Sequence, residues 1–150
     1  MNVTLHDIAS RFIGMAEVKG SASNPGILAM LKLDGDWPED DAVPWCSAAL
    51  NYWAWLLRLP RSKSLRARSW LAVGRVIADV EARVGFDVVI LKQHIDDPDA
   101  HSLDARGHVG LYSGGFAQTI HVLGGNQGDR VSVAPFPFER VLGIRRLSEG

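Results

Sequence analysis

Residues 40–55 read DDAVPWCSAALNYWAW and contain Cys46, the only cysteine of the chain. Pro44 is expected in the first turn of a helix, because its ring presets the backbone angle and its missing N–H group is not needed there. Apolar residues recur at helical spacing after it, at Trp45, Ala49, Tyr52, Trp53 and Leu56. Pro60 and the polar run that follows end the segment. The sequence therefore predicts a largely buried helix with Cys46 in its first turn.

A cysteine at this position has two possible roles. The unpaired N–H groups and the positive end of the helix dipole favour an anion there. A thiolate is such an anion, so the pKa of Cys46 should fall and its nucleophilicity at neutral pH should rise. A lone cysteine can also be a small buried hydrophobe. The choice between the two depends on whether the chain supplies a base.

Length and composition describe one ordinary domain over residues 1–150, with one sizeable core. A formal net charge of -1 removes any general electrostatic attraction to nucleic acid or a membrane. One cysteine cannot form an internal disulfide or a cysteine-based zinc site. No apolar run approaches the ~20 residues that cross a bilayer, and no secretory signal is present. We expect a monomer without a cofactor, made in the cytoplasm and delivered by other means if it acts elsewhere.

Two short helices are predicted before the Cys46 helix. Thr4 has the character of a helix cap, with Asp7 three residues later. Asn24 and Pro25 can start a second helix that continues through Leu31. A third short helix is expected over residues 64–71.

Three polar segments are candidate binding sites. The acidic loop DGDWPEDD, residues 34–41, faintly resembles half of a calcium loop, but its spacing is irregular and a closing glutamate is missing. Residues 94–106 carry histidines and aspartates, yet nothing fixes their geometry, and an exposed connection is expected. Residues 61–68 are basic but short and mixed, so a solvated face is expected rather than a nucleic-acid site. We predict that no metal is bound.

The pattern changes from helices to strands after Gly85. Residues 86–91, FDVVIL, are β-branched and apolar, which is typical of a buried strand. Shorter strands are expected over residues 107–112, 118–123, 130–134 and 141–145, with turns at 113–115 and 124–129 and with Pro135 and Pro137 interrupting the sheet. Helices first and strands second indicate an α+β fold with an antiparallel sheet.

A reactive cysteine needs a base and a group that orients the base. His108 suits the first role, because it opens a strand between Gly107 and Gly110 and its pKa lies near neutrality. His121 lies mid-strand, where a packed or outward-facing histidine is expected. Asn126 leaves the next strand in a glycine-rich turn and can accept a hydrogen bond from the imidazole, as asparagine does in Cys-His-Asn sites.

The segment PWCSAALNYW, residues 44–53, resembles the nucleophile helix of the CHAP and NlpC/P60 cell-wall peptidases. It is most similar to a group of short phage and bacterial proteins with a Pro-Trp-Cys-Ser-Ala-Phe helix start. Further segments resemble that group in the same order: RSWL (68–71), FDVVI (86–90), GHVGLY (107–112), VLGGNQ (122–127), VSV (131–133) and LGIRR (142–146). The resemblance implies a papain-like α+β fold with N-terminal helices packed on the sheet.

The resemblance also implies a function and a site. It implies one CHAP-like catalytic domain, without a separate cell-wall-binding module, that cuts an amide bond of peptidoglycan as an endopeptidase or N-acetylmuramoyl-L-alanine amidase. Cys46 would be the nucleophile, His108 the base and Asn126 the orienting group. Many CHAP domains have a glutamate near the third catalytic position, where this sequence has Gly124. The sequence departs from the family pattern there, and the departure concerns the identity of the orienting group. Trp45 and Trp70 are expected to line the substrate groove, although both are also candidates for the core.

We expect a phage endolysin that reaches the periplasmic cell wall after release. A secreted or tail-associated antibacterial amidase is the first alternative. The second is an inactive domain of the same fold that binds glycan or protein, for which an activated thiol would be unnecessary.

Overall fold

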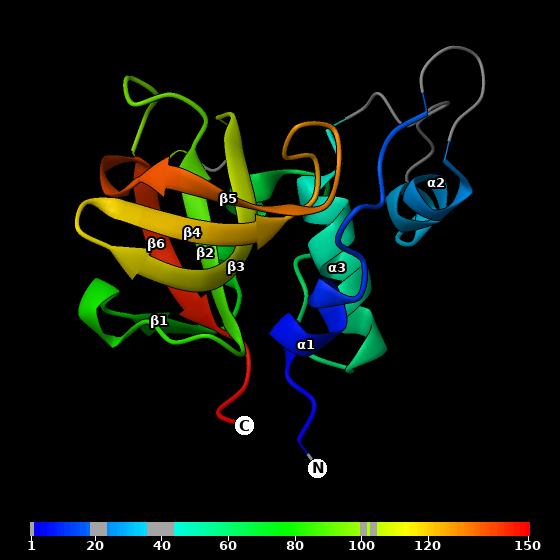
Figure 1. Ribbon diagram of the computed structural model, residues 1–150, viewed down its shortest axis with the longest axis horizontal. Helices are drawn as coiled ribbons and strands as arrows, with labels where there is room; N and C mark the ends of the chain where they lie inside the picture. Colours follow the sequence, from blue (N-terminus) through cyan, green and yellow to red (C-terminus); the bar gives the residue numbers. More distant parts are fainter. Residues whose placement is uncertain (1, 19–23, 36–43, 100–101, 103–104) are drawn as a thin grey trace.

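A computed structural model describes residues 2–18, 24–35, 44–99, 102 and 105–150, in which helices come first and strands follow (Figure 1). The helices are α1 (Leu5–Ser10), α2 (Pro25–Lys32) and α3 (Cys46–Leu56), with the 3-10 helices η1 (Ala67–Ala72), η2 (Asp79–Glu81) and η3 (Phe138–Arg140). The strands are β1 (Arg75–Ile77), β2 (Asp87–Lys92), β3 (Gly107–Phe116), β4 (Thr119–Gly124), β5 (Ser132–Pro137) and β6 (Val141–Arg146). No helix within the described ranges is long and apolar enough to span a membrane.

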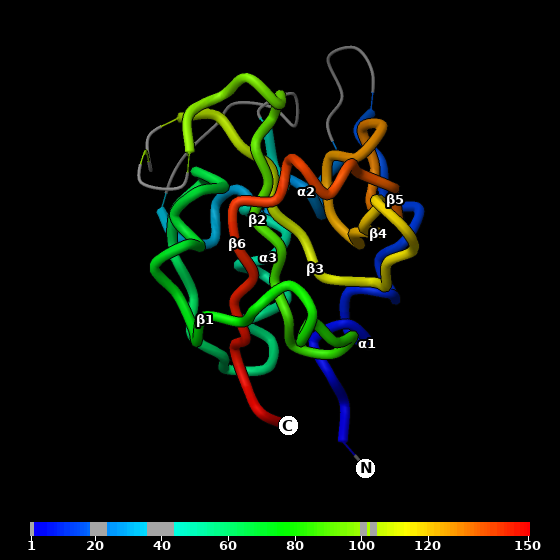
Figure 2. The backbone as a smooth tube through the Cα atoms, turned by 90° about the vertical axis from the view of Figure 1, so that its left-hand side faces the viewer, coloured from blue at the N-terminus to red at the C-terminus, as the bar shows by residue number. Residues whose placement is uncertain are grey.

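The strands form one antiparallel sheet in the order β1-β6-β2-β3-β4-β5. Figure 2 shows this order across the sheet, from β1 on the left to β5 on the right. The helices lie on one side of the sheet: α3 packs on β3 and β4, and α2 contacts α3 farther from the sheet (Figure 1). This arrangement confirms the predicted α+β class with helices packed on an antiparallel sheet.

The central strand β2 is buried on both faces. Val88 and Ile90 belong to the core beneath the helices, whereas Val89 and Leu91 belong to a second apolar cluster on the opposite face of the sheet. A strand with both faces covered needs apolar residues at successive positions rather than alternate ones. The continuous run VVIL in residues 88–91 is therefore explained by the position of β2 in the middle of the sheet.

Local signals placed the first two helices correctly. Thr4 and Asp7 form a reciprocal capping box: the Thr4 N–H donates to Asp7 Oδ2 over 2.9 Å, and the Asp7 N–H donates to Thr4 Oγ1 over 3.1 Å. Asn24 caps α2 by accepting hydrogen bonds from the backbone N–H groups of Gly26 and Ile27. Each side chain satisfies helix N–H groups that have no partner inside the helix.

Several predicted boundaries differ from the structure. Pro44 precedes α3, and Cys46 is its first helical residue, with Trp45 as the N-cap. The predicted helix over residues 64–71 is the 3-10 helix η1. Strand β3 continues through the predicted turn at 113–115, because a bulge there is accommodated by Gly114 at φ +108°. The two prolines lie inside β5, where they are tolerated because β5 is an edge strand that pairs only with β4.

The His6 side chain couples the stability of the fold to pH. Its Nε2 atom lies 2.9 Å from Ser113 Oγ on β3, and its Nδ1 atom lies 3.3 Å from Ser10 Oγ. Burial lowers the pKa of His6 below its ordinary value of 6.5, although the charge of Asp7 raises it. Between the lowered folded pKa and the ordinary value, the unfolded chain binds a proton that the folded chain does not.

We therefore expect His6 to reduce stability as the pH falls through this window. The measurement is the urea midpoint of the wild type and of His6→Gln from pH 7.5 to pH 5.5, where His6→Gln should lose less stability than the wild type. An identical pH dependence in both proteins would contradict the prediction.

Candidate active site

Cys46 occupies the first position of α3, where the helix meets β3, and its side chain is only 5% exposed. The N-cap residue, Trp45, makes no side-chain hydrogen bond to the start of the helix. The backbone N–H groups of Ser47 and Val109 donate to the Cys46 sulfur. These N–H groups and the helix dipole favour the thiolate over the thiol.

His108, the second residue of β3, lies beside Cys46. It pairs with Leu91 of β2 in the sheet, so the central strands fix its backbone. Its side chain forms a hydrogen bond with Cys46, and its Nε2 atom lies 2.8 Å from Gln127 Oε1, which leaves Nδ1 to face the thiol. The Phe136 ring from β5 packs against the imidazole, with 5.3 Å between ring centroids and 31° between ring planes. The imidazole ring of His108 is therefore held by contacts with Cys46, Gln127 and Phe136.

The pKa values of Cys46 and His108 shift in opposite directions. Burial is the largest influence on Cys46 and raises its pKa, but the charge and hydrogen bond of His108 and the two backbone N–H groups outweigh it, so the pKa of Cys46 is lowered. Burial is also the largest influence on His108 and lowers its pKa. The charge and hydrogen bond of Cys46 and the hydrogen bond of Gln127 outweigh burial, so the pKa of His108 is raised. These directions are those of a thiolate–imidazolium pair.

Gln127 orients the imidazole. Its Nε2 atom donates to the backbone oxygens of Val122, over 3.0 Å, and Ser132, over 2.7 Å. Because these carbonyls can only accept, the amide nitrogen must point toward them and Oε1 must point toward His108. The His108 Nε2 atom is therefore the donor in its hydrogen bond with Gln127. This bond fixes both the ring orientation and the site of its proton.

The absence of a side chain at Gly124 makes room for Gln127. A Cβ atom at Gly124 would lie 2.8 Å from Gln127 Oε1 and 3.3 Å from its Cδ. The space beside Gly124 is thus occupied by the Gln127 amide, which arrives from the turn after β4. The glycine at position 124 and the position of the Gln127 amide therefore depend on each other.

The expected orienting residue, Asn126, lies next to the residue that contacts His108. Asn126 adopts φ 58° in the turn and lines the cleft, but the amide placed against His108 is that of Gln127. Asparagine tolerates the left-handed conformation better than most residues. Its backbone turns the chain so that the following side chain points into the site. The side chain that contacts His108 is therefore that of Gln127, one residue after the expected Asn126.

The two tryptophans expected in the groove are core residues. Trp45 and Trp70 are both 0% exposed, and neither lines the cleft. The indole N–H of Trp45 donates to Glu17 Oε1 over 2.7 Å, and that of Trp70 donates to Ser47 Oγ over 2.9 Å. A buried indole needs such a partner for its N–H group. Of the two places that the sequence allowed for Trp45 and Trp70, the structure has both in the core.

A cleft of about 820 Å³ opens around Cys46, His108 and Gln127. Arg66, Arg106 and Arg140 line it, and no carboxylate is present among its described lining residues. The remaining lining residues are Pro44, Leu65, Ala67, Gln93, Ala105, Gly107, Asn126, Gly128, Ala134, Pro135 and Phe136. The side chains around the cleft therefore favour a ligand that carries negative charge.

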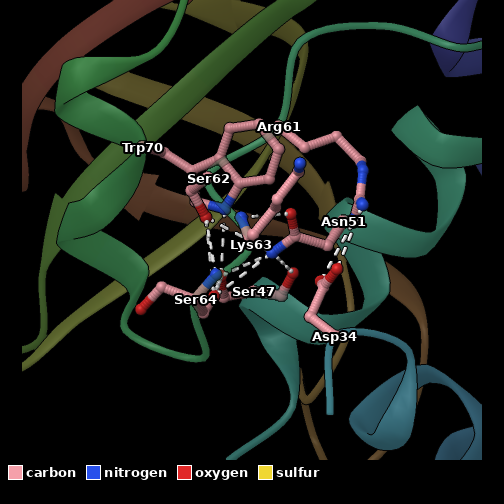
Figure 3. Close-up of polar contacts among 8 residues, drawn as sticks. All are labelled: Asp34, Ser47, Asn51, Arg61, Ser62, Lys63, Ser64 and Trp70. Atoms are coloured by element: carbon pink, nitrogen blue, oxygen red, sulfur yellow. Dashed lines mark hydrogen bonds and ion pairs between the residues drawn. The ribbon is translucent and has the colours of Figure 1, made fainter. Parts of the chain in front are cut away.

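A buried polar network holds one wall of this cleft against α3 (Figure 3). The Ser47 hydroxyl, next to Cys46, donates to the Ser64 carbonyl over 2.6 Å. Asn51 Nδ2 donates to the same carbonyl over 3.2 Å, while Asn51 Oδ1 accepts from the Lys63 N–H over 2.9 Å. Residues 65–67, which follow directly, line the cleft. The network therefore fixes the position of this wall relative to the first turn of α3.

The basic segment 61–68 is not the uniform solvated face that the sequence suggested. Arg61 binds Asp34 through two hydrogen bonds of 2.9 and 3.0 Å (Figure 3). Arg68 is 0% exposed. Asp34 of the acidic loop is thereby engaged by an arginine, and residues 36–43 lie outside the described residues. Within the described ranges, no group of three or more His, Cys, Asp or Glu side chains could hold a metal ion. That no metal is required remains a prediction.

No protein-family model and no curated protein sequence matches this chain. Among solved structures, it is similar to that of NlpC1 from Trichomonas vaginalis, with a TM-score of 0.55 and 17% sequence identity. The alignment covers 95% of this chain and 42% of that chain, so this chain spans less than half the length of the neighbour. At this identity the likeness concerns the fold. The chain has an NlpC/P60-like α+β fold.

Proposed function

We propose that this chain is a cysteine-dependent hydrolase that cleaves an amide bond of bacterial peptidoglycan. The observation that carries the proposal is the linked set of hydrogen bonds from Cys46 through His108 to Gln127 at a cleft. A nucleophile, a base beside it and a group that orients the base are the parts that covalent acyl transfer needs. The lowered pKa of Cys46 and the raised pKa of His108 support the same assignment.

The first half of the reaction forms a thioester. The Cys46 thiolate attacks the amide carbonyl carbon, and the carbonyl oxygen becomes an oxyanion. The uncapped N–H groups at the start of α3, that of Cys46 first, are placed to stabilise this charge. When the C–N bond breaks, the leaving amine takes the proton from the His108 imidazolium, which becomes neutral imidazole.

The second half hydrolyses the thioester. Neutral His108 removes a proton from a water molecule as that water attacks the thioester carbonyl. The carboxylic acid product leaves when the C–S bond breaks, and the Cys46 thiolate and the His108 imidazolium are restored. Gln127 accepts from His108 Nε2 throughout both halves, so Nδ1 remains directed at the reacting atoms.

Two observations support peptidoglycan as the substrate. The fold is NlpC/P60-like, and peptidoglycan is the substrate that the sequence resemblance implies. The arginines of the cleft suit the free carboxylates of cell-wall stem peptides. Whether the bond is a peptide cross-link or the sugar–peptide amide, and whether the protein acts as a phage endolysin, are finer parts of the same proposal.

The test is digestion of purified peptidoglycan, stripped of outer membrane, followed by mass analysis of the released fragments. The wild type is expected to release fragments with new amine and carboxylate ends, whose masses identify the bond. Cys46→Ser should release none. Intact peptidoglycan after prolonged incubation with folded wild-type protein would overturn the proposal and favour a binding domain.

A further inference from the structure

Arg68 is a buried cation beside the cleft that has no assigned role. It lies in η1 and is 0% exposed. Buried charges are ordinarily paired with opposite charges. The partners of Arg68 are instead backbone carbonyls: its Nε donates to Arg106 O over 2.9 Å, and its Nη1 donates to Asp99 O over 2.8 Å and to Ser102 O over 3.2 Å. Its Nη2 has no partner within the described ranges.

All of these carbonyls belong to the connection between β2 and β3. The Asp99 carbonyl also accepts the Ser102 N–H over 3.1 Å, and the Ser102 carbonyl accepts the Ala105 N–H over 3.3 Å. The guanidinium therefore binds two carbonyls that also accept backbone N–H groups of this connection, as well as the carbonyl of Arg106. Ala105 and Arg106 line the cleft. One side chain thus joins η1 to the part of this connection that borders the site.

The stem of Arg68 also contacts the residue before His108. A Cβ atom at Gly107 would lie 3.1 Å from Arg68 Cγ and 2.9 Å from Leu91 O. The glycine at this position lets the arginine pass close to β3. The carbonyl contact at Arg106 and this close approach at Gly107 together place Arg68 against the two residues that precede His108.

We propose that Arg68 is a positioning residue of the cleft, which holds residues 105–107 as the wall beside His108. The inference rests on the proposed function for its substrate. Arg68 contacts neither Cys46 nor the His108 ring in any described interaction, so it acts on where a substrate lies rather than on the thiolate–imidazolium pair.

To hold the cleft wall, the Arg68 side chain must bind several carbonyls at fixed distances, and the planar guanidinium group can do this. Nε and Nη1 are rigidly joined in one plane, so the distance between the bound carbonyls is set by the side chain itself. Lysine retains the charge but presents one nitrogen on a flexible stem and cannot span the same carbonyls. Arg68→Lys should therefore loosen the wall without changing the charge.

The test compares Arg68→Lys with the wild type on soluble peptidoglycan fragments released by a muramidase. We expect kcat/KM to fall by up to about 100-fold, mostly through KM. The rate and pH midpoint of Cys46 alkylation by iodoacetamide should stay at wild-type values, because this small reagent reports only the reactivity of the thiol. Hydrogen exchange at the Ser102 and Ala105 amides should become faster.

Arg145→Lys is the matched control. Like Arg68, Arg145 donates from Nε to a backbone carbonyl over 2.9 Å; its acceptor is Leu71 of η1. Arg145 does not line the cleft. Arg145→Lys should leave KM and the hydrogen exchange of the Ser102 and Ala105 amides unchanged. If Arg68→Lys fails to fold, Arg68→Gln, which keeps amide donors without a buried charge, is measured in its place.

The outcomes separate this inference from the proposed function. Wild-type KM and wild-type exchange in a folded Arg68 variant would overturn the inference. A KM that rises equally in Arg145→Lys would show a general loss of stability and would also overturn it. If the wild type does not cleave the fragments, the proposed function fails, and the exchange measurement alone decides whether Arg68 holds the wall.

Discussion

Cys46→Ser is expected to lower peptidoglycan hydrolysis at least about 10⁴-fold while the protein stays folded. A serine hydroxyl is far harder to ionise than a thiol, so it cannot form the ion pair with the His108 imidazolium that a thiolate forms. His108→Ala should have a comparable effect, because both the proton donor for the leaving amine and the partner charge of the thiolate are lost. The measurement is turnover on purified peptidoglycan, with circular dichroism as the check on folding.

The pH dependence of Cys46 alkylation tests the same pair without a substrate. Since the pKa of Cys46 is lowered, the thiolate persists to lower pH, and the alkylation midpoint should lie below the ordinary thiol value of about 8.5. In His108→Ala, the charge and hydrogen bond that favour the thiolate are absent while burial still opposes it. The midpoint should therefore move upward.

His121→Ala is the matched histidine control. His121 lies in β4, pairs with Pro135 across the sheet and does not line the cleft. Its replacement should leave both turnover and the alkylation midpoint at wild-type values. An unreactive Cys46 in the native protein, together with an active Cys46→Ala variant, would show that the cysteine is only a core residue.

Replacement of Gln127 is expected to have the second-largest effect. In Gln127→Ala, nucleophile and base remain, but the ring of His108 loses the acceptor at Nε2 that sets its orientation and proton position. Turnover should fall by about 100-fold with little change in KM, because the lost contact acts on the base rather than on the substrate. The alkylation midpoint should rise, since the Gln127 hydrogen bond helps to raise the pKa of His108.

Two neighbouring variants sharpen this test. Gly124→Ala should reproduce part of the loss, because the added Cβ would lie 2.8 Å from Gln127 Oε1. Asn126→Gly preserves the left-handed turn while removing the asparagine amide, and it should cost less than about tenfold. A larger loss in Asn126→Gly than in Gln127→Ala would return the orienting role to Asn126.

Features that depend on neighbours in sequence could be predicted from the sequence. The caps at Thr4 and Asn24 involve side chains that reach backbone groups two or three residues away, so their signals are local. The apolar run of β2 indicated a strand buried on both faces. The positions of Cys46 at a helix start and of His108 at a strand start were also local features. The order of helices and strands was enough to predict the α+β class.

Features that depend on which surfaces meet in space required the tertiary structure. Asn126 and Gln127 are adjacent amides, and the choice between them follows from the left-handed turn at Asn126, the space at Gly124 and the carbonyls of Val122 and Ser132. None of these constraints is visible in the spacing of residue types, because they arise from separate strands and a turn brought together by folding.

The burial of three large side chains also depends on contacts with residues distant in the sequence. From the sequence, Trp45 and Trp70 were candidates for the groove wall, and Arg68 was expected on a solvated face. All three are 0% exposed. In each case a distant group accepts from N–H donors of the buried side chain: Glu17 from the Trp45 indole, Ser47 from the Trp70 indole, and the β2–β3 connection from Nε and Nη1 of Arg68. The sequence by itself determined which residues can form helices and strands, and it predicted that Cys46 and His108 pair. Only the tertiary structure decided which polar atoms find partners, and that pairing sets which side chains are buried and which face the cleft.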